Sequence, residues 1–159
     1  MQVWVKLGMR PNCSVNKGDF LMNILFVCTG NTCRSPMAEG IFKKVIKNKS
    51  FAVSSAGISA DNSSKATKNA IKVCDEINVD LGDHVSKNIF DVDINNIDKF
   101  VVMTDSHQDI LLNLGIDKNK IYVLGNQIQD PYGGNLAVYR KCRDQITKAL
   151  GEFVDEYCH

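Results

Sequence analysis

The chain has 159 residues, a formal net charge of +1, 44% hydrophobic residues and 23% charged residues. This length fits one domain with a buried core, and this composition is typical of a soluble globular protein. A net charge so close to zero excludes a general binder of nucleic acids or membranes, so any affinity for anions must come from a local site.

The first twenty-one residues differ from the rest of the chain. They show little periodicity, whereas Met22 opens a strongly apolar segment. Residues 17–19 (Lys-Gly-Asp) can be encoded by a purine-rich ribosome-binding sequence suitably spaced before a Met22 codon. We therefore expect residues 1–21 to be an N-terminal extension of doubtful origin and residues 22–159 to form the domain. Because the chain shows neither a secretory signal core nor a transmembrane run, we expect it to be cytoplasmic.

Apolar runs and helical periodicity alternate along the domain. The expected strands are residues 23–27, 51–56, 100–103 and 121–124, and the expected helices begin near Ser35, Ala66, Asp105 and Asn135. We expect Ser35 to cap the first helix and Pro36 to occupy its first turn. This alternation predicts an α/β fold, a single three-layer domain with a central, mainly parallel four-stranded sheet and helices on both faces.

The segment between the first strand and the first helix carries the strongest chemical signal. It reads Cys28-Thr29-Gly30-Asn31-Thr32-Cys33-Arg34-Ser35, with five residues between the cysteine and the arginine. The backbone N–H groups of such a loop can converge on one anion at a helix N-terminus, and Arg34 offers a planar, charged fork to phosphate oxygens. We therefore expect residues 29–34 to bind phosphate, with Gly30 supplying a backbone geometry that a side chain would resist.

The same surroundings should make Cys28 a nucleophile. A cysteine near an arginine at a helix N-terminus is stabilised as a thiolate, which is the reactive form. Ser35 is placed to donate a hydrogen bond to that sulfur, and Asn31 to brace the loop from beneath. Taken alone, Cys28 would be an inert cysteine at a strand end, and the arginine, the serine and the strand–loop–helix context together reverse that interpretation.

The run from Ile24 to Glu39 closely resembles the low-molecular-weight protein tyrosine phosphatases, and in particular the branch of bacterial protein arginine phosphatases. The segments Ser54-Ser55-Ala56-Gly57 and Asp130-Pro131-Tyr132-Gly133-Gly134 resemble the family's second strand ending and its acid-bearing loop. The resemblance spans residues 22–157. It implies a cysteine-dependent protein phosphatase without a cofactor or metal, in which Cys28 attacks phosphorus, Arg34 clamps the phosphate and Asp130 is the general acid.

Asp130 owes its role to this resemblance. Without the resemblance, Asp-Pro followed by Gly-Gly reads as ordinary turn chemistry, and both interpretations can hold together. An acid is needed because an alkoxide, a phenoxide or a guanidine leaves more easily when it is protonated. Pro131 restricts the backbone next to Asp130 and can fix its aim.

Thr32 and Tyr132 are the residues that we expect to determine substrate selectivity. In tyrosine-specific members the position of Thr32 typically holds a bulkier aliphatic residue such as isoleucine, whereas bacterial arginine phosphatases resemble this chain in having threonine. A second aromatic residue often follows Tyr132 in the tyrosine-specific relatives, where this chain has glycine. We therefore expect phosphoarginine to be favoured over phosphotyrosine. The alternative is that Thr32 is merely a small loop residue and that Tyr132 lines the pocket for either substrate.

Two other function classes are weaker fits. A thiol-linked arsenate reductase resembles these phosphatases in fold and anion loop, but it needs further redox cysteines, and residues 102–109 contain none. Cys74 and Cys142 fall on apolar helix faces, while Cys13 and Cys158 lie near the ends of the chain. A noncatalytic phosphate-binding module would need the loop but not the nucleophile, the arginine and the acid together.

The other cysteines, histidines and acidic residues are expected to have structural or secondary roles. Cys33 is a possible redox partner of Cys28, with a small packing residue as the equal alternative. The three separated histidines His84, His107 and His159 make no credible metal site and are interpreted as surface or structural residues. Asp105 is expected to start a helix, and Tyr139 to lie in the core. The expected partners are phosphorylated proteins, with inorganic phosphate as product, and neither nucleic acid nor membrane.

Overall fold

The computed structural model describes residues 22–46 and 51–157. Four parallel strands form one sheet in the order β2-β1-β3-β4. Their bounds are β1 (Met22–Cys28), β2 (Phe51–Gly57), β3 (Lys99–Val102) and β4 (Ile121–Val123). The predicted α/β fold with a central parallel sheet is therefore confirmed.

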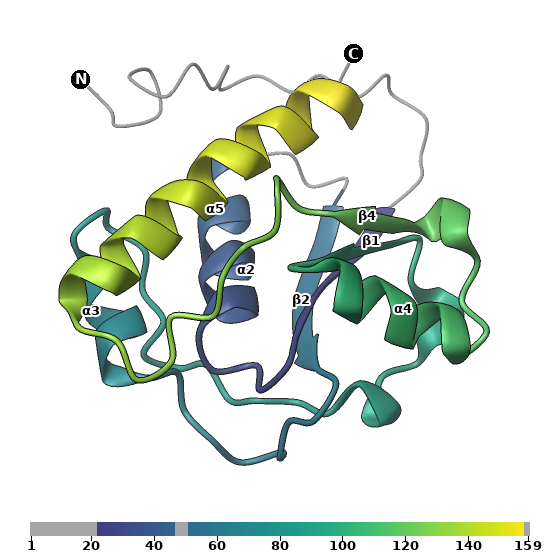
Figure 1. The fold of residues 1–159 in the computed structure, drawn as a ribbon, viewed down its shortest axis with the longest axis horizontal. Helices are drawn as coiled ribbons and strands as arrows, with labels where there is room; N and C mark the ends of the chain where they lie inside the picture. The colour runs from purple at the N-terminus through teal and green to yellow at the C-terminus, as the bar shows by residue number, and fades with distance from the viewer. Residues whose placement is uncertain (1–21, 47–50, 158–159) are drawn as a thin grey trace.

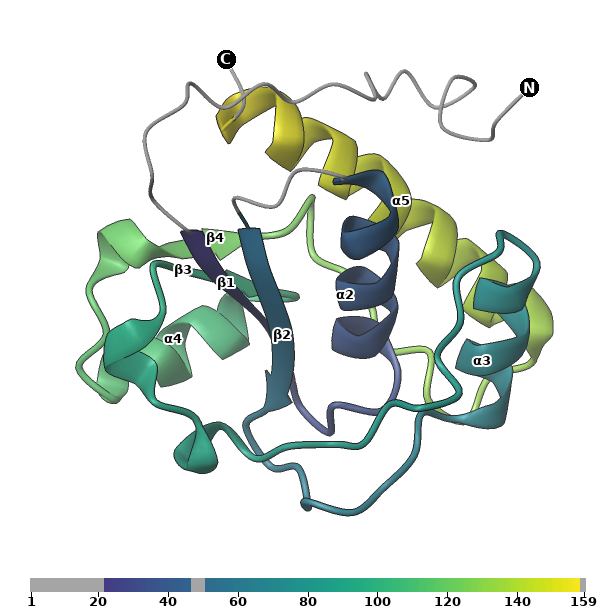
Figure 2. The same ribbon diagram turned by 180° about the vertical axis from the view of Figure 1, so that it is seen from behind.

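Helices cover both faces of this sheet. They are α2 (Arg34–Val45), α3 (Lys68–Asp75), α4 (Asp105–Asn113) and α5 (Leu136–Tyr157), with short 3-10 turns η1 (Ile89–Asp91), η2 (Ile94–Asn96) and η3 (Lys118–Lys120). Seen from either side in Figures 1 and 2, α2, α3 and α5 lie together, and α4 lies apart from them. None of the helices in the described ranges is long and apolar enough to cross a membrane.

Strand β1 is buried on both faces, which explains its nearly continuous apolar sequence. Ile24 and Phe26 belong to the larger core cluster beneath α2 and α5, whereas Leu25 and Val27 belong to the cluster on the α4 side. All four side chains are fully buried. Because successive side chains of a strand point to opposite faces, this one segment joins the two halves of the core.

The strand order places the loop after β1 at the point where the topology reverses. The chain passes from β1 through α2 to β2 on one side of β1, and later returns to place β3 on the other side. Connections leave the carboxyl ends of β1 and β3 in opposite directions, which opens a crevice there. Open α/β sheets bind their ligands in such a crevice.

Two details of the expected elements are wrong. Helix α2 begins at Arg34, and its N-cap residue Cys33 makes no side-chain cap, so Ser35 lies inside the helix and does not cap it. The hydroxyl of Ser35 is instead engaged with the sulfur of Cys28. Helix α3 begins at Lys68, later than expected, after Thr67 accepts a hydrogen bond from the backbone of Ala70. The proposed start at Met22 concerns residues 1–21, which lie outside the described residues.

Candidate active site

The phosphate loop, which we define as residues 28–34, turns from the end of β1 into α2. Cys28 is 2% exposed, and its Sγ lies 2.9 Å from Ser35 Oγ. The backbone N–H of Asn31 also donates to this sulfur, at 3.3 Å. Two donors can therefore stabilise a negative charge on Cys28, one of them from the loop and the other from the first turn of α2.

Asn31 is the central brace of the phosphate loop. Its side chain is fully buried and donates to Ser35 Oγ at 2.8 Å and to Ser55 Oγ at 2.9 Å. Its Oδ1 accepts from the backbone N–H of Lys87 at 2.9 Å, and its backbone oxygen lies 2.7 Å from His84 Nε2. The residue thus ties the loop to β2 and to the segment before η1.

The backbone strain of the loop is located at Asn31, not at Gly30. Asn31 has a φ of 54°, a left-handed conformation that asparagine tolerates better than most residues. A Cβ added at Gly30 would meet only Thr32 Oγ1 at 3.6 Å, an ordinary contact. The expectation that Gly30 supplies the special geometry is therefore wrong.

The glycine that the loop does require is Gly57, at the end of β2. A Cβ there would lie 2.5 Å from the backbone oxygen of Thr29 and 2.9 Å from the backbone nitrogen of Asn31. Gly57 pairs with Cys28 in the sheet register, so the neighbouring strand passes directly against the loop. Only a residue without a side chain allows this approach.

Arg34 is 5% exposed and reaches across the site to the opposite connection. Its Nη1 donates to the backbone oxygen of Ile128 at 3.1 Å, and its Nη2 lies 3.5 Å from Thr29 Oγ1. Its Nη2 also lies 3.7 Å from Asp130 Oδ2. The guanidinium therefore joins the phosphate loop to the connection between β4 and α5.

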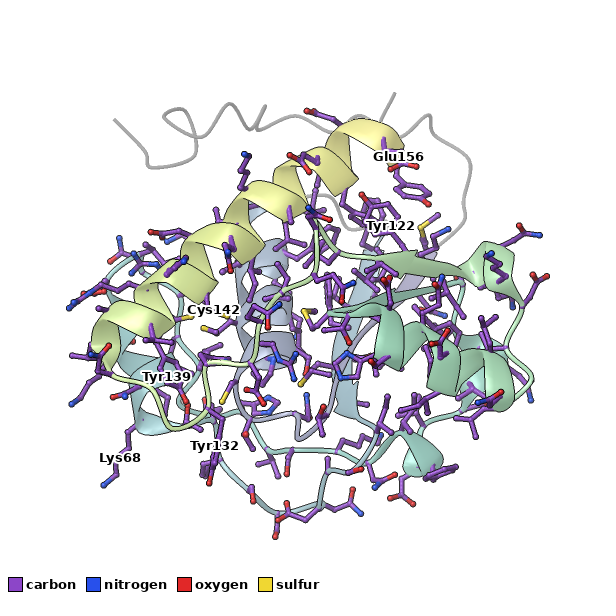
Figure 3. All side chains as sticks on the ribbon, viewed as in Figure 1. Lys68, Tyr122, Tyr132, Tyr139, Cys142 and Glu156 are labelled. Atoms are coloured by element: carbon purple, nitrogen blue, oxygen red, sulfur yellow. The ribbon has the colours of Figure 1, made fainter. Side chains whose placement is uncertain are left out.

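That connection carries the acid loop, which we define as residues 130–134. Asp130 is 55% exposed, and its Oδ1 accepts from the backbone N–H of Tyr132 at 3.0 Å. The expected turn is therefore present together with the carboxylate. Tyr132 is 76% exposed. In Figure 3 it lies in the lower part of the molecule, far from Tyr122 and Glu156 in the upper part.

The two loops enclose a cavity of about 210 Å³. Its lining comprises Cys28, Thr29, Gly30, Thr32, Cys33, Arg34, Asp130 and Tyr132. Six of these residues come from the phosphate loop and two from the acid loop, which lies about a hundred positions later in the chain. A thiol, a guanidinium and a carboxylate thus face one small space, as hydrolysis of a phosphate monoester or phosphoramidate requires.

The sequence profile of the family described as low molecular weight phosphotyrosine protein phosphatase matches residues 23–157. The chain belongs to this family. A protein-arginine-phosphatase of Bacillus subtilis is 34% identical over 145 residues, covering 85% of this chain and 96% of the relative. The low molecular weight protein-tyrosine-phosphatase PtpB of Staphylococcus haemolyticus is 34% identical over 137 residues, covering 82% of this chain and 96% of the relative.

Solved structures of the family share the fold. One is a mutant of the YwlE arginine phosphatase with a phosphorylated active-site serine. It is 32% identical to this chain, with a TM-score of 0.79, and the match covers 85% of this chain and 95% of the other. The relatives therefore include enzymes named for two different phosphorylated amino acids, arginine and tyrosine.

His107 was interpreted as a surface or structural residue, and the structure places it inside the site region. It lies in the first turn of α4, is 4% exposed, and has Nε2 2.9 Å from Thr29 Oγ1. Burial lowers the pKa of His107 to about 4, and the positive charge of Arg34 acts in the same direction against the opposing influence of Asp130. The imidazole is therefore neutral at neutral pH.

Cys33 lies among hydroxyl groups on the α3 and α5 side of the loop. Its Sγ is 3.4 Å from Tyr139 Oη and 3.5 Å from Thr67 Oγ1. Tyr139 is buried as expected, and burial raises its pKa to about 12. The backbone N–H of Thr67 donates to the backbone oxygen of Thr32 at 2.9 Å, so this cluster supports the second half of the phosphate loop.

The other cysteines and acids behave as structural groups. Burial raises the pKa of both Cys74 and Cys142 to about 12, so both thiols stay protonated and are poorly suited to a disulfide relay. Asp105 begins α4, as expected, and its Oδ2 accepts from Gln127. Among the described residues, no cluster of three metal-ligating side chains is present. Cys13, Cys158 and His159 lie outside those residues.

Several residues that build the site were given no part in it by the sequence. Ser55 and Gly57 belong to the motif at the end of the second strand, whereas His84, Lys87 and His107 carried no local signal, and all five reach the phosphate loop from other elements. The Thr-x-x-His spacing of Thr104 and His107 at a helix start could have suggested a cap, but not its contact with Thr29. Such contacts depend on which elements the fold brings together.

Proposed function

We propose that this chain is a protein phosphatase that works through a cysteinyl-phosphate intermediate and prefers phosphoarginine. The observation that carries the proposal is the cavity shared by Cys28, Arg34 and Asp130. It holds a nucleophile, a fixed cation and a proton donor within one small volume. Phosphorylated protein side chains are the substrates, and inorganic phosphate is the product.

In the first step, the thiolate of Cys28 attacks phosphorus in line, and the bond between phosphorus and the leaving atom breaks. Asp130 delivers its proton to that atom, which is the guanidine nitrogen of phosphoarginine or the phenol oxygen of phosphotyrosine. The backbone N–H groups of residues 29–34 and the guanidinium of Arg34 hold the equatorial oxygens. Ser35 and the N–H of Asn31 stabilise the charge on sulfur before attack.

In the second step, the Asp130 carboxylate takes a proton from water, and the water oxygen attacks phosphorus. The sulfur–phosphorus bond breaks and inorganic phosphate is released. The sulfur leaves as a thiolate that accepts a hydrogen bond from Ser35. The phosphorylated active-site serine in the related YwlE structure supports this route, because it places a phosphoryl group on the nucleophile position of a relative.

The preference for phosphoarginine rests on the rim of the cavity. Among the described residues, the hydrogen-bond partner of Thr32 Oγ1 is the Cys33 sulfur at a long 3.8 Å, so this hydroxyl can also form a hydrogen bond with a polar guanidino group. Tyr132 is largely exposed and stands at the same rim, next to the glycines that complete the acid loop. Similarity to two protein-arginine-phosphatases, from Bacillus subtilis and Geobacillus stearothermophilus, points the same way.

Phosphotyrosine is the second candidate, and the family description and the PtpB relatives favour it. The same cysteine chemistry serves both substrates, because only the leaving atom changes. A phenyl ring can stack on Tyr132 at the open rim. In that case Thr32 contributes loop packing and no substrate contact.

The deciding experiment compares kcat/KM for phosphoarginine and phosphotyrosine peptides of matched sequence. We expect a preference for phosphoarginine that Thr32→Ile reverses or abolishes, with Thr32→Ser as the matched variant that keeps the hydroxyl. Cys28→Ser is the control and should remove turnover of both peptides. A wild-type preference for phosphotyrosine would transfer the proposal to the second candidate, and activity that survives Cys28→Ser would overturn the cysteine mechanism.

A further inference from the structure

His107 and Thr29 form a hydrogen-bonded chain that ends at the candidate active site. The hydroxyl of Thr104 lies 3.0 Å from His107 Nδ1, and His107 Nε2 lies 2.9 Å from Thr29 Oγ1. Thr29 Oγ1 is in turn 3.5 Å from Arg34 Nη2. Thr29 lines the cavity, whereas His107 is buried behind it.

The donors and acceptors of this chain can be counted. A neutral imidazole has one N–H and one lone pair, and a hydroxyl has one proton and two lone pairs. Thr104 Oγ1 accepts from the backbone N–H of His107 at 3.3 Å and can donate its own proton to Nδ1. In that tautomer Nε2 carries the imidazole proton and donates it to Thr29.

This arrangement decides what Thr29 offers to the cavity. Its oxygen accepts from His107 Nε2 and from Arg34 Nη2, which can only donate. Both lone pairs are then used, and the hydroxyl proton of Thr29 is left for a third partner on the cavity side. In the opposite tautomer, Thr29 would donate to Nε2 and turn a lone pair toward the phosphate, which a phosphate oxygen would repel.

We infer that the side-chain hydroxyl of Thr29 is a further phosphate ligand, and that His107 is a positioning residue that holds this hydroxyl as a donor and keeps it against Arg34. This inference rests on the proposed phosphatase function of the same site. It adds a side-chain donor to the backbone N–H groups of the loop. It also gives α4, which contributes no lining residue to the cavity, a part in the chemistry.

The test measures phosphate binding without turnover. Inorganic phosphate is titrated calorimetrically into Cys28→Ser protein that carries one further substitution. Thr29→Val keeps the shape of the side chain but removes the hydroxyl, and we expect it to weaken binding about ten- to hundredfold, the range expected for one hydrogen bond to a charged group. Thr29→Ser keeps the hydroxyl and should bind within about twofold of the parent.

Two substitutions of His107 separate positioning from packing. The amide nitrogen of Gln reaches roughly where Nε2 lies, so His107→Gln should still donate to Thr29 and preserve the affinity for phosphate. Asn reaches only as far as Nδ1, so His107→Asn should weaken binding as much as Thr29→Val does. The double variant Thr29→Val with His107→Asn should be no weaker than either single variant, because both remove the same donor.

Unchanged binding by Thr29→Val would overturn the inference, and so would equal affinity of the Gln and Asn variants or a multiplicative effect in the double variant. Thermal unfolding checks that each variant is folded. If His107→Asn does not fold, the comparison of Thr29→Val with Thr29→Ser and His107→Gln decides alone. Failure of the Cys28→Ser parent to bind phosphate would instead count against the proposed function itself.

Discussion

The phosphate loop and the acid loop face the same cavity but are held in different ways. In the phosphate loop, Cys28, Asn31 and Arg34 are at most 5% exposed and are tied to four other parts of the chain. In the acid loop, Asp130 and Tyr132 are more than half exposed. A side-chain hydrogen bond joins the acid loop to α3, in which Asn69 Nδ2 donates to the backbone oxygen of Gly134 at 3.2 Å.

This difference matches the two tasks that we propose for the loops. Every substrate presents the same phosphoryl group, so a rigid anion site does not restrict the range of substrates. Its prearranged donors also avoid reorganisation during the reaction. The leaving side differs from one protein substrate to the next, so an open and lightly held acid loop can adapt. Substitutions of the buried, hydrogen-bonded residues of the phosphate loop should therefore cost stability and activity together, and those in the acid loop should cost activity alone.

Removing the acid tests this contrast most strongly. Asp130→Asn should lower kcat on a phosphopeptide by about 10²- to 10⁴-fold, the usual contribution of a general acid, while changing the free energy of unfolding by less than about 0.5 kcal/mol. Steady-state kinetics and urea unfolding of the same sample measure both quantities. A drop in stability comparable to the loss of activity would show that the acid loop is not independent of the fold.

Acid titration of stability probes the buried side of the phosphate loop. His107 has a pKa of about 4 in the folded protein and 6.5 as its ordinary value, so between these pH values the unfolded chain binds a proton that the native protein does not. Stability should fall as the pH drops from about 6.5 to 4, by roughly 1.4 kcal/mol for each unit between the two values. Urea unfolding across this window should show the decline.

The control for this titration is His107→Gln, which has no imidazole and should lose the decline. Asp61 and Glu76 also have lowered pKa values, Asp61 chiefly through its hydrogen bond with Ser86 and Glu76 chiefly through Arg140. Their contributions are lost below the ordinary carboxylate range and so lie outside most of the window. A decline that persists in His107→Gln would assign it to other groups.

A pair of glycine substitutions compares crowded and open backbone in the same region. Gly57→Ala places a Cβ 2.5 Å from the backbone of Thr29 and should destabilise the protein by about 1–3 kcal/mol or more. Gly30→Ala meets only an ordinary contact and should change stability by less than about 0.5 kcal/mol. Chemical denaturation measures the free energy of unfolding of both variants. A larger loss of stability in Gly30→Ala than in Gly57→Ala would contradict the packing of β2 against the loop.

The smallest effect should come from loosening the acid loop. Asn69→Ala removes the hydrogen bond to Gly134 and should lower kcat/KM by about twofold to tenfold, the worth of one neutral hydrogen bond. Phosphate affinity of the same variant in Cys28→Ser protein should stay unchanged, because the phosphate loop is not touched. Weakened phosphate binding would show that the two loops are coupled.

Much of the fold followed from patterns along the chain. Buried runs such as residues 23–27 and the periodic faces of α2 and α5 were predictable, because a strand buried on both faces and a helix on a sheet impose strong local constraints. The errors lie at element ends. Ser35 resembles a helix cap, but Cys28 Sγ, seven residues earlier, competes for its hydroxyl, and the cap was therefore predicted wrongly.

By itself, the sequence determined the α/β class, the parallel sheet and the family, because hydrophobic period and a dense local motif are properties of neighbouring residues. It brought forward Cys28, Arg34 and Asp130 as candidates through the same motifs. Only the tertiary structure decided that Gly57 and not Gly30 makes room for the loop, and that His107 stands behind Thr29. Those contacts join residues far apart in the chain, and they exist only once the strands have paired and the helices have packed.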